Sequence, residues 1–428
     1  MTQVALGRPE LVLHNRLTHS LKVEQVGSAI YSRLRLLAGE NDDVNADPQA
    51  IAAACLAHDL GHPPFGHAAE QKLNELLTCP DHRRNARPYK VRKESPCGGC
   101  DLEDGFEGNA QSFRILTRLA SHRSNGGHGL DLTRQTLAAV TKYPWLRGEN
   151  DEKPGKWGAY DCDVDALSFA LQRDVTTKMS SGELLQTLDA AIMDWADDIS
   201  YAVHDIEDFY RSGLIPLSDY HFDPRSDTLE RFLTYVRAQP QFAHMDEDSP
   251  LYQAMRNMWT LLPTSIYNGT KENHLELDRA RSYLLTEFIN AVSIVDGQLT
   301  RETGQEELNS LIKQLIWFHV IDGPRLSNIQ LGQQRVVQDL YQILKPLAIA
   351  AYDVDDTNPD KMKDEQLIRR LPYNLTVFVK EAIAHPGATY QRDKAILRGL
   401  VDFIASLSDE DAYFHHSVLT GASTHASL

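Results

Sequence analysis

The sequence predicts an all-α fold with loop insertions. Apolar residues recur at helical spacing in most segments that show any periodicity. No alternation of strands and helices is present, and no repeat has the period of a solenoid. Two segments rich in glycine, proline and charge interrupt the helical pattern. We therefore expect a single domain over residues 1–428, with a core over about 1–211 and a C-terminal helical part over 212–428.

The first helices have clear start and stop signals. One is expected over 17–37, and the next begins at Asp47-Pro48, where a carboxylate caps the helix and proline takes its first position. This second helix should stop at Gly61, before Pro63-Pro64. Further helices are expected at about 106–121, 182–211, 228–238, 275–294, 306–317, 332–350 and 390–407. Residues 79–104 and 146–164 are expected to form loops.

Composition excludes several classes of protein. The formal net charge is −17 and the pI is near 5.4, which argues against general nucleic-acid coating. Single-stranded nucleic acid stays open as a partner, although no motif supports it. No apolar run approaches the roughly 20 residues of a membrane helix, and the N-terminus lacks a signal-peptide pattern. With five cysteines in the chain, reduced thiols are the default. We expect a cytoplasmic protein with no membrane association.

Three histidines and one aspartate are concentrated in the segment His58-Asp59-Leu-Gly-His62-Pro-Pro-Phe-Gly-His67. Imidazole and carboxylate groups are the ligands of Mn, Fe, Zn, Ni and Co, and of Mg when water completes the shell. A lone His-Asp pair is more often a helix cap. The density of histidines here favours a metal site at the end of the helix.

Other segments supply further donors. His19 lies in the first turn of the first predicted helix, and Asp197, Tyr201 and Asp205 share one face of the 182–211 helix. A polar helix face is usually only solvated. Nevertheless, His19, His58, Asp59 and Asp197 together would provide the protein ligands of one octahedral site.

The 79–104 loop contains a second candidate metal site. Cys79-x2-His82 and Cys97-x2-Cys100 have the spacing of a tetrahedral structural zinc site. The alternative is a solvated loop with incidental thiols, and the sequence does not decide between them. Between the pairs lies a basic stretch that could contact nucleic acid, a regulatory nucleotide or an acidic neighbouring subunit, comprising Arg83, Arg84, Arg87, Lys90, Arg92 and Lys93.

Several of these motifs together resemble one family. The strings RLTHS (16–20), HDLGHPPFGH (58–67), GFEGNAQ (105–111), KYPW (142–145) and ADDISYAVHDIED (196–208) resemble the bacterial deoxyguanosine triphosphate triphosphohydrolases of the HD superfamily. The likeness resumes more weakly in ILRGLVDFIASLSD (396–409). It implies an HD-domain helical fold and metal-dependent hydrolysis of dGTP, or of other dNTPs, to deoxynucleoside and triphosphate. It further implies control of deoxynucleotide pools, and we expect a homo-oligomer.

The resemblance also assigns roles to individual residues. His19, His58, Asp59 and Asp197 match the family's metal ligands, while His67, His62 and Glu70 match residues that transfer protons and activate water around the α-phosphate. Arg16 matches a phosphate-binding arginine, Tyr201 and Asp205 match the deoxyribose pocket, and Gln3 matches a glutamine facing the sugar 3′-hydroxyl. Family members usually carry a longer segment before the Thr-Gln-Val that follows Met1 here, so we expect that this chain either begins late or was given a start codon too far downstream.

Hydrolysis at the α-phosphorus requires an activated water, neutralised phosphate charge and a proton for the departing 5′-oxygen. Arg16 suits bidentate phosphate binding, and Lys142, Lys156 and Arg398 are weaker candidates, each of which could be an ordinary surface charge. Histidine titrates near neutrality, so we choose His67 as the proton carrier. The alternative is a structural histidine bonded to a carboxylate.

Tyr201 is expected to exclude a 2′-hydroxyl and so select deoxynucleotides. Two other functions remain in competition with the triphosphohydrolase. One is an HD phosphodiesterase or 5′-nucleotidase, and the other is a sensor that has lost catalysis.

Overall fold

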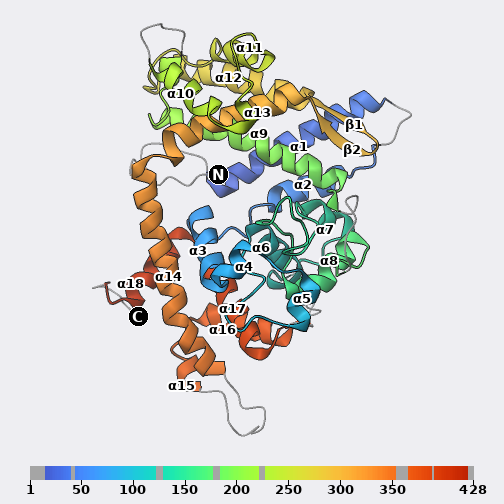
Figure 1. The fold of residues 1–428 in the computed structure, drawn as a ribbon, viewed down its shortest axis with the longest axis vertical. Helices are drawn as coiled ribbons and strands as arrows, with labels where there is room; N and C mark the ends of the chain where they lie inside the picture. Colours follow the sequence, from blue (N-terminus) through green and yellow to red (C-terminus); the bar gives the residue numbers. More distant parts are fainter. Residues whose placement is uncertain are drawn as a thin grey trace. The chain divides into compact units, whose positions relative to one another are not determined.

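The computed structural model describes the chain in seven stretches, which are residues 15–39, 44–121, 129–176, 184–220, 227–352, 365–387 and 390–422. Within them nearly all regular structure is helical, and a single two-stranded hairpin is the only sheet (Figure 1). The predicted all-α class is therefore confirmed. No helix in these stretches is long and apolar enough to cross a membrane.

The chain forms two compact units, each built from segments distant in sequence. The first unit spans residues 1–56 and 187–328, and the second spans 57–186 and 329–428. Each unit thus contains residues from both sides of position 211, where the expected core ended. The description of the whole chain as one HD-type domain stays a prediction.

In the first unit, two long helices contain the candidate site residues that the sequence predicted there. These are α1 (Arg16–Ala38) and α9 (Leu188–Arg211), which pack against each other and against α12 (Lys271–Asn290). The other elements of this unit are α2 (Pro48–Ala57), two 3₁₀ turns (Leu217–Tyr220 and Pro240–Phe242), α10 (Thr228–Arg237), α11 (Pro250–Trp259), α12 (Lys271–Asn290), β1 (Val292–Val295), β2 (Gln298–Arg301), α13 (Thr303–Ile316) and a π-helical turn (Trp317–Ile321).

The β1–β2 hairpin corrects the predicted helix at 275–294. Helix α12 ends at Asn290, and the following Val-Ser-Ile-Val segment pairs antiparallel with β2, with Val292 opposite Arg301. Between the strands, Asp296 and Gly297 both have positive φ, at 51° and 75°. An Asp-Gly pair with this conformation is typical of a two-residue hairpin turn, and β-branched residues favour the strand that precedes it.

The second unit contains mostly shorter helices. They are α3 (His67–Leu77), α4 (Pro80–Arg84), α5 (Tyr89–Glu94), α6 (Gly108–Arg114) with a π-helical extension (Ile115–Leu119), α7 (Arg134–Val140), a 3₁₀ turn (Asp161–Asp163), α8 (Val164–Leu171), α14 (Pro324–Tyr352, which begins in the first unit), α15 (Glu365–Ile368), α16 (Tyr373–Ala384), α17 (Arg392–Ser406) and α18 (Asp409–Leu419). The predicted 79–104 loop therefore contains two short helices, α4 and α5. The 146–164 loop is largely as expected, with helix only from Asp161 onward.

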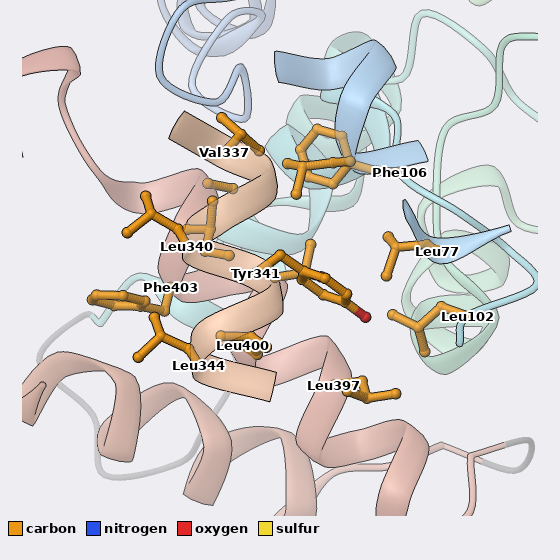
Figure 2. Close-up of a cluster of buried hydrophobic side chains, with 14 of the residues drawn as sticks. Leu77, Leu102, Phe106, Val337, Leu340, Tyr341, Leu344, Leu397, Leu400 and Phe403 are labelled. Atoms are coloured by element: carbon orange, nitrogen blue, oxygen red, sulfur yellow. The ribbon is translucent and has the colours of Figure 1, made fainter. Parts of the chain in front are cut away.

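A large apolar cluster forms the core of the second unit. Helix α14 contributes Leu340 and Leu344, α17 contributes Leu400, and α3 and the segment before α6 contribute Leu77 and Phe106 (Figure 2). All five side chains are essentially inaccessible to solvent. Burial of this kind stabilises by about 25 cal/mol per Å² of apolar surface, and it joins segments separated by more than 200 residues in sequence.

Candidate active site

The His58-Asp59 pair lies in a turn directly after α2. The helix ends at Ala57. Two backbone hydrogen bonds then form the turn, from Leu60 N–H to Ala57 O (3.2 Å) and from His62 N–H to Asp59 O (3.2 Å). Residues on successive positions of a regular helix point in different directions. The turn relaxes this constraint, so that neighbouring side chains in this segment converge.

Helix α6 holds this turn in place. The Ser112 hydroxyl donates to His58 O (2.8 Å) and accepts from Gly61 N–H (2.9 Å), within the second unit. A Cβ atom on Gly61 would lie 2.1 Å from Ser112 N, which no real Cβ tolerates. Glycine is therefore required here by the close approach of α6. The helix itself ends at Ala57, before the expected stop at Gly61.

Two histidines face one carboxylate oxygen in the turn. His62 Nδ1 lies 3.1 Å from Asp59 Oδ1, and His58 Nε2 lies 3.5 Å from the same oxygen. Burial opposes ionisation of Asp59, but the charges of His58 and His62 outweigh it and hold the pKa of this carboxyl well below its usual range. Burial likewise disfavours the charged form of His62, yet Asp59 raises the pKa of that imidazole.

A second pair forms where the chain enters α3. Phe65 and Gly66 both have positive φ (65° and 60°), which turns the backbone so that α3 begins at His67. His67 Nδ1 lies 2.8 Å from Glu70 Oε2, one helical turn later, and the His67 side chain is 67% exposed. The rings of His62 and His67 meet edge to face, 5.3 Å apart.

The Glu70 carboxylate is buried among donors. Besides His67, it accepts from Gly108 N–H at the start of α6 (3.1 Å), and Lys156 Nζ lies 3.5 Å away. Burial raises the pKa of a carboxyl group, but here the hydrogen bond from His67 and the charges of Lys156 and His62 lower the pKa of Glu70. Glu70 is therefore an anion that can orient the His67 ring.

In the first unit, His19 and Asp197 form a matching pair. Asn15 caps α1 in a reciprocal box with Thr18 (2.9 and 2.8 Å), which sets His19 at the end of the first helical turn. His19 is buried, and its Nε2 lies 3.2 Å from Asp197 Oδ1 on α9. An imidazole and a carboxylate thus face each other in each of the two units.

The other residues predicted on α9 have definite surroundings. Asp205 is buried, and Tyr201 is partly buried with the Lys313 ammonium 5.8 Å from its ring centre. Arg16 takes the first helical position of α1, three residues before His19. Gln3 lies outside the described residues. The roles in substrate binding that the sequence suggested for these residues stay predictions.

Lys142 and Arg398 lie elsewhere in the second unit. Lys142 lines a cavity of about 880 Å³ whose lining contains none of the histidines above. Arg398 is fully buried, donates to Asp104 Oδ1 (3.0 Å), and stacks over Tyr160 with 3.6 Å from its guanidinium carbon to the ring centre. Its charge is thus paired inside the protein, which is the environment of a structural arginine. A contact with substrate stays a prediction for both.

Three residues near the His58–His67 segment had no role assigned from the sequence alone, or only a minor one. Ser112 holds the turn, and Glu107 caps α6 by accepting from Asn109 N–H and Ala110 N–H. Lys156 joins Glu107 (2.9 Å) to Glu70. Glu107 and the GFEGNAQ string of which it is part were visible in the sequence, but nothing in the string itself indicates these contacts.

Comparison with known proteins agrees with the motifs. The HD domain family model matches residues 16–94. A deoxyguanosinetriphosphate triphosphohydrolase-like protein of Streptomyces coelicolor is 33% identical over 430 residues, covering 95% of this chain and 83% of the relative. Proteins of the same description from Shewanella pealeana (30%; 76% of this chain, 72% of the relative) and Bifidobacterium longum (28%; 98% and 78%) are also similar. The chain therefore belongs to the deoxyguanosinetriphosphate triphosphohydrolase-like family of HD-domain proteins.

Proposed function

We propose that this chain is a metal-dependent phosphohydrolase that cleaves deoxynucleoside triphosphates, with dGTP as the first candidate, into deoxynucleoside and intact triphosphate. The HD domain and the names of the relatives support a phosphohydrolase. The observation that carries the finer proposal is the convergence of His58 and His62 on Asp59 next to the His67–Glu70 pair. We further propose a cytoplasmic homo-oligomer that controls deoxynucleotide pools.

His19, His58, Asp59 and Asp197 are the proposed ligands of one divalent cation. Their donor atoms are imidazole nitrogens and carboxylate oxygens, and within each unit a nitrogen faces an oxygen, at 3.2 Å in one and 3.5 Å in the other. This donor set fits Mn, Fe, Co, Ni or Zn, and Mg if water completes the shell. Such an ion, when bound, supplies an acidified water and neutralises phosphate charge.

The proposed proton carrier is His67, positioned by Glu70. The imidazole is exposed, so a bound nucleotide can reach it, and its Nδ1 is held by the buried Glu70 carboxylate. This leaves Nε2 as the nitrogen available for proton transfer to the departing 5′-oxygen. Water supplies the oxygen that bonds to the α-phosphorus, the bond to the 5′-oxygen breaks, and the products are deoxynucleoside and triphosphate. His62 and Glu70 complete the set proposed to handle protons.

The substrate contacts follow from the same resemblance. Arg16 is proposed to bind phosphate, Gln3 the sugar 3′-hydroxyl, and Asp205 the deoxyribose. Tyr201 is proposed to fill the space of a 2′-hydroxyl, and Lys313 near its ring would restrict the movement of that ring. Discrimination of this kind works by excluding the competitor rather than by adding attraction to the substrate.

Product analysis tests the proposal. Purified protein is incubated with each of the four dNTPs and with GTP, in the presence of Mn²⁺, Mg²⁺ or Co²⁺, and the products are separated by chromatography. Deoxynucleoside plus triphosphate is the expected result, with GTP turned over far more slowly than dGTP. Orthophosphate or a nucleoside monophosphate would refute the proposed bond cleavage and indicate another HD phosphohydrolase. Asp59→Asn in the same assay controls for contaminating activity.

A further inference from the structure

Four potential ligands outside the proposed active site lie together in the second unit. The sulfur atoms of Cys79, Cys97 and Cys100 and a ring nitrogen of His82 are all within 4.8 Å of one another. All three cysteines are free thiols. Cys100 Sγ lies 3.5 Å from His82 Nδ1. A histidine nitrogen directed at a group of sulfurs has no function in a disulfide, so disulfide pairing alone does not explain this arrangement.

The distance between Cys100 and His82 matches one edge of a tetrahedral zinc site. Zinc–sulfur bonds of about 2.3 Å and zinc–nitrogen bonds of about 2.0 Å at tetrahedral angles place sulfur and nitrogen roughly 3.5 Å apart. The observed 3.5 Å between Cys100 and His82 matches this edge. Three thiols and one imidazole occupy all four positions, which is the composition of a closed structural site rather than a catalytic one.

The local backbone supports thiolates in these positions. Cys79 N–H donates to Cys100 Sγ (3.2 Å), and Gly99 N–H donates to Cys97 Sγ (3.3 Å). Cys79 precedes α4, which places His82 one turn later, and the Cys97-Gly-Gly-Cys100 turn brings the second pair back to the first. Pairs of ligands with this spacing on two separate turns are typical of zinc sites.

The surrounding contacts hold the ligands from outside. Glu103 accepts from Cys97 N–H (3.0 Å), and Arg87 pairs with the same carboxylate. Arg147 donates to the His82 carbonyl (3.2 Å). Groups that orient ligands in this way are a regular part of metal sites.

We propose that Cys79, His82, Cys97 and Cys100 bind a structural zinc ion that fastens together the two ends of the 79–100 segment. Soft thiolates select zinc over Mg or Mn, so this site is chemically separable from the proposed catalytic one. Immediately beside the cluster, Leu102 N–H donates to Leu77 O (3.0 Å), and both side chains enter the buried core (Figure 2). The zinc thus fixes the point where the chain leaves α3 and returns toward α6.

Metal analysis of the full-length chain tests the proposal. Protein produced with zinc in the medium should retain one zinc per chain through dialysis against a weak chelator, in addition to the metal of the catalytic site. Cys97→Ser combined with Cys100→Ser should lose that one equivalent and be cleaved faster by trypsin between Arg83 and Lys93. Cys55→Ala, which removes a buried thiol elsewhere, is the matched control and should keep the zinc.

Cobalt substitution provides a second, spectroscopic readout. Replacement of the retained zinc by Co²⁺ should produce a thiolate-to-cobalt charge-transfer band that persists in Asp59→Asn. If the double variant does not fold, His82→Ala, which removes a single ligand, should weaken zinc retention and shift the cobalt spectrum. Equal zinc in parent and variant, a parent that folds without retained zinc, or thiol titration revealing a Cys97–Cys100 disulfide would each overturn the proposal.

Discussion

Replacement of His67 by alanine separates a proton carrier from a structural histidine. The side chain is 67% exposed, so its removal leaves no cavity, and Glu70 keeps its hydrogen bond from Gly108 N–H and its proximity to Lys156. We therefore expect the free energy of unfolding to change by less than about 1 kcal/mol. A lost general acid lowers kcat by roughly 10²-fold or more, equivalent to about 2.7 kcal/mol of barrier.

The assay measures kcat for dGTP at saturating substrate, together with bound metal and the melting temperature. Gln71→Ala, an exposed change on the same helix, is the control and should leave all three unchanged. Loss of the catalytic metal in His67→Ala would identify His67 as a ligand, and the proton role would then move to His62 or Glu70. Activity within a fewfold of the parent would refute any role in proton transfer.

A double-mutant cycle tests whether Glu70 acts through His67. If Glu70 only orients the imidazole, Glu70→Gln in a His67→Ala background should cost little further activity, because residues that act as a unit are strongly non-additive. Additive losses would mean that Glu70 has an independent part in the reaction, such as activation of water.

Asp59→Asn should abolish turnover while circular dichroism remains that of the parent; activity retained at saturating Mn²⁺ would contradict its assignment as a ligand. Gly61→Ala should destabilise by about 1–3 kcal/mol because its Cβ would overlap the α6 backbone, whereas Gly155→Ala, in open space, should be neutral in the same thermal melts. The folded pKa of Glu70 lies below its ordinary value of 4.5, so its contribution to stability is complete above that pH and is lost as pH falls further. Glu70→Gln should therefore destabilise the protein at neutral pH, and its difference from the parent should shrink in denaturant titrations below pH 4.5. Arg398→Ala should cost about 3–5 kcal/mol by leaving a buried aspartate unpaired; a folded variant with a raised KM for dGTP would instead favour a phosphate contact.

Long helices with clear end signals were predictable from the sequence. The helix expected at 17–37 extends over Arg16–Ala38, and the one expected at 306–317 extends over Thr303–Ile316. In these segments the apolar period persists over several turns, so local information is sufficient. The hairpin at 292–301 was missed because its apolar run is too short to show whether the period is that of a helix or a strand. The Asp296-Gly297 pair, which is typical of a hairpin turn, was the feature in the sequence that indicated it.

The sequence was sufficient to name the donor groups of the candidate site, but not the contacts that hold them in place. The pairs His62–Asp59 and His67–Glu70 form within one short stretch of chain, so their spacing in sequence already indicates convergence. Ser112, which donates to His58 O, lies 54 positions later in the sequence, so no local sequence pattern could predict this contact. Helical periodicity could not show that the charge of Arg398 is paired inside the core, because burial is a property of tertiary packing.

Residues 101–112 connect the proposed zinc site to the turn that contains His58. The segment begins beside the proposed zinc group, where Leu102 pairs with Leu77, and it ends in α6, where Ser112 holds the His58 turn. Helix α6 is anchored in turn by the buried ion pair of Arg114 with Asp402 on α17 (2.9 Å). A histidine-rich motif thus specifies which atoms face one another, while Asp402, 288 positions after Arg114, helps to hold the helix behind them. Substitutions far from the motif should therefore affect turnover through the position of α6, without changing any proposed ligand.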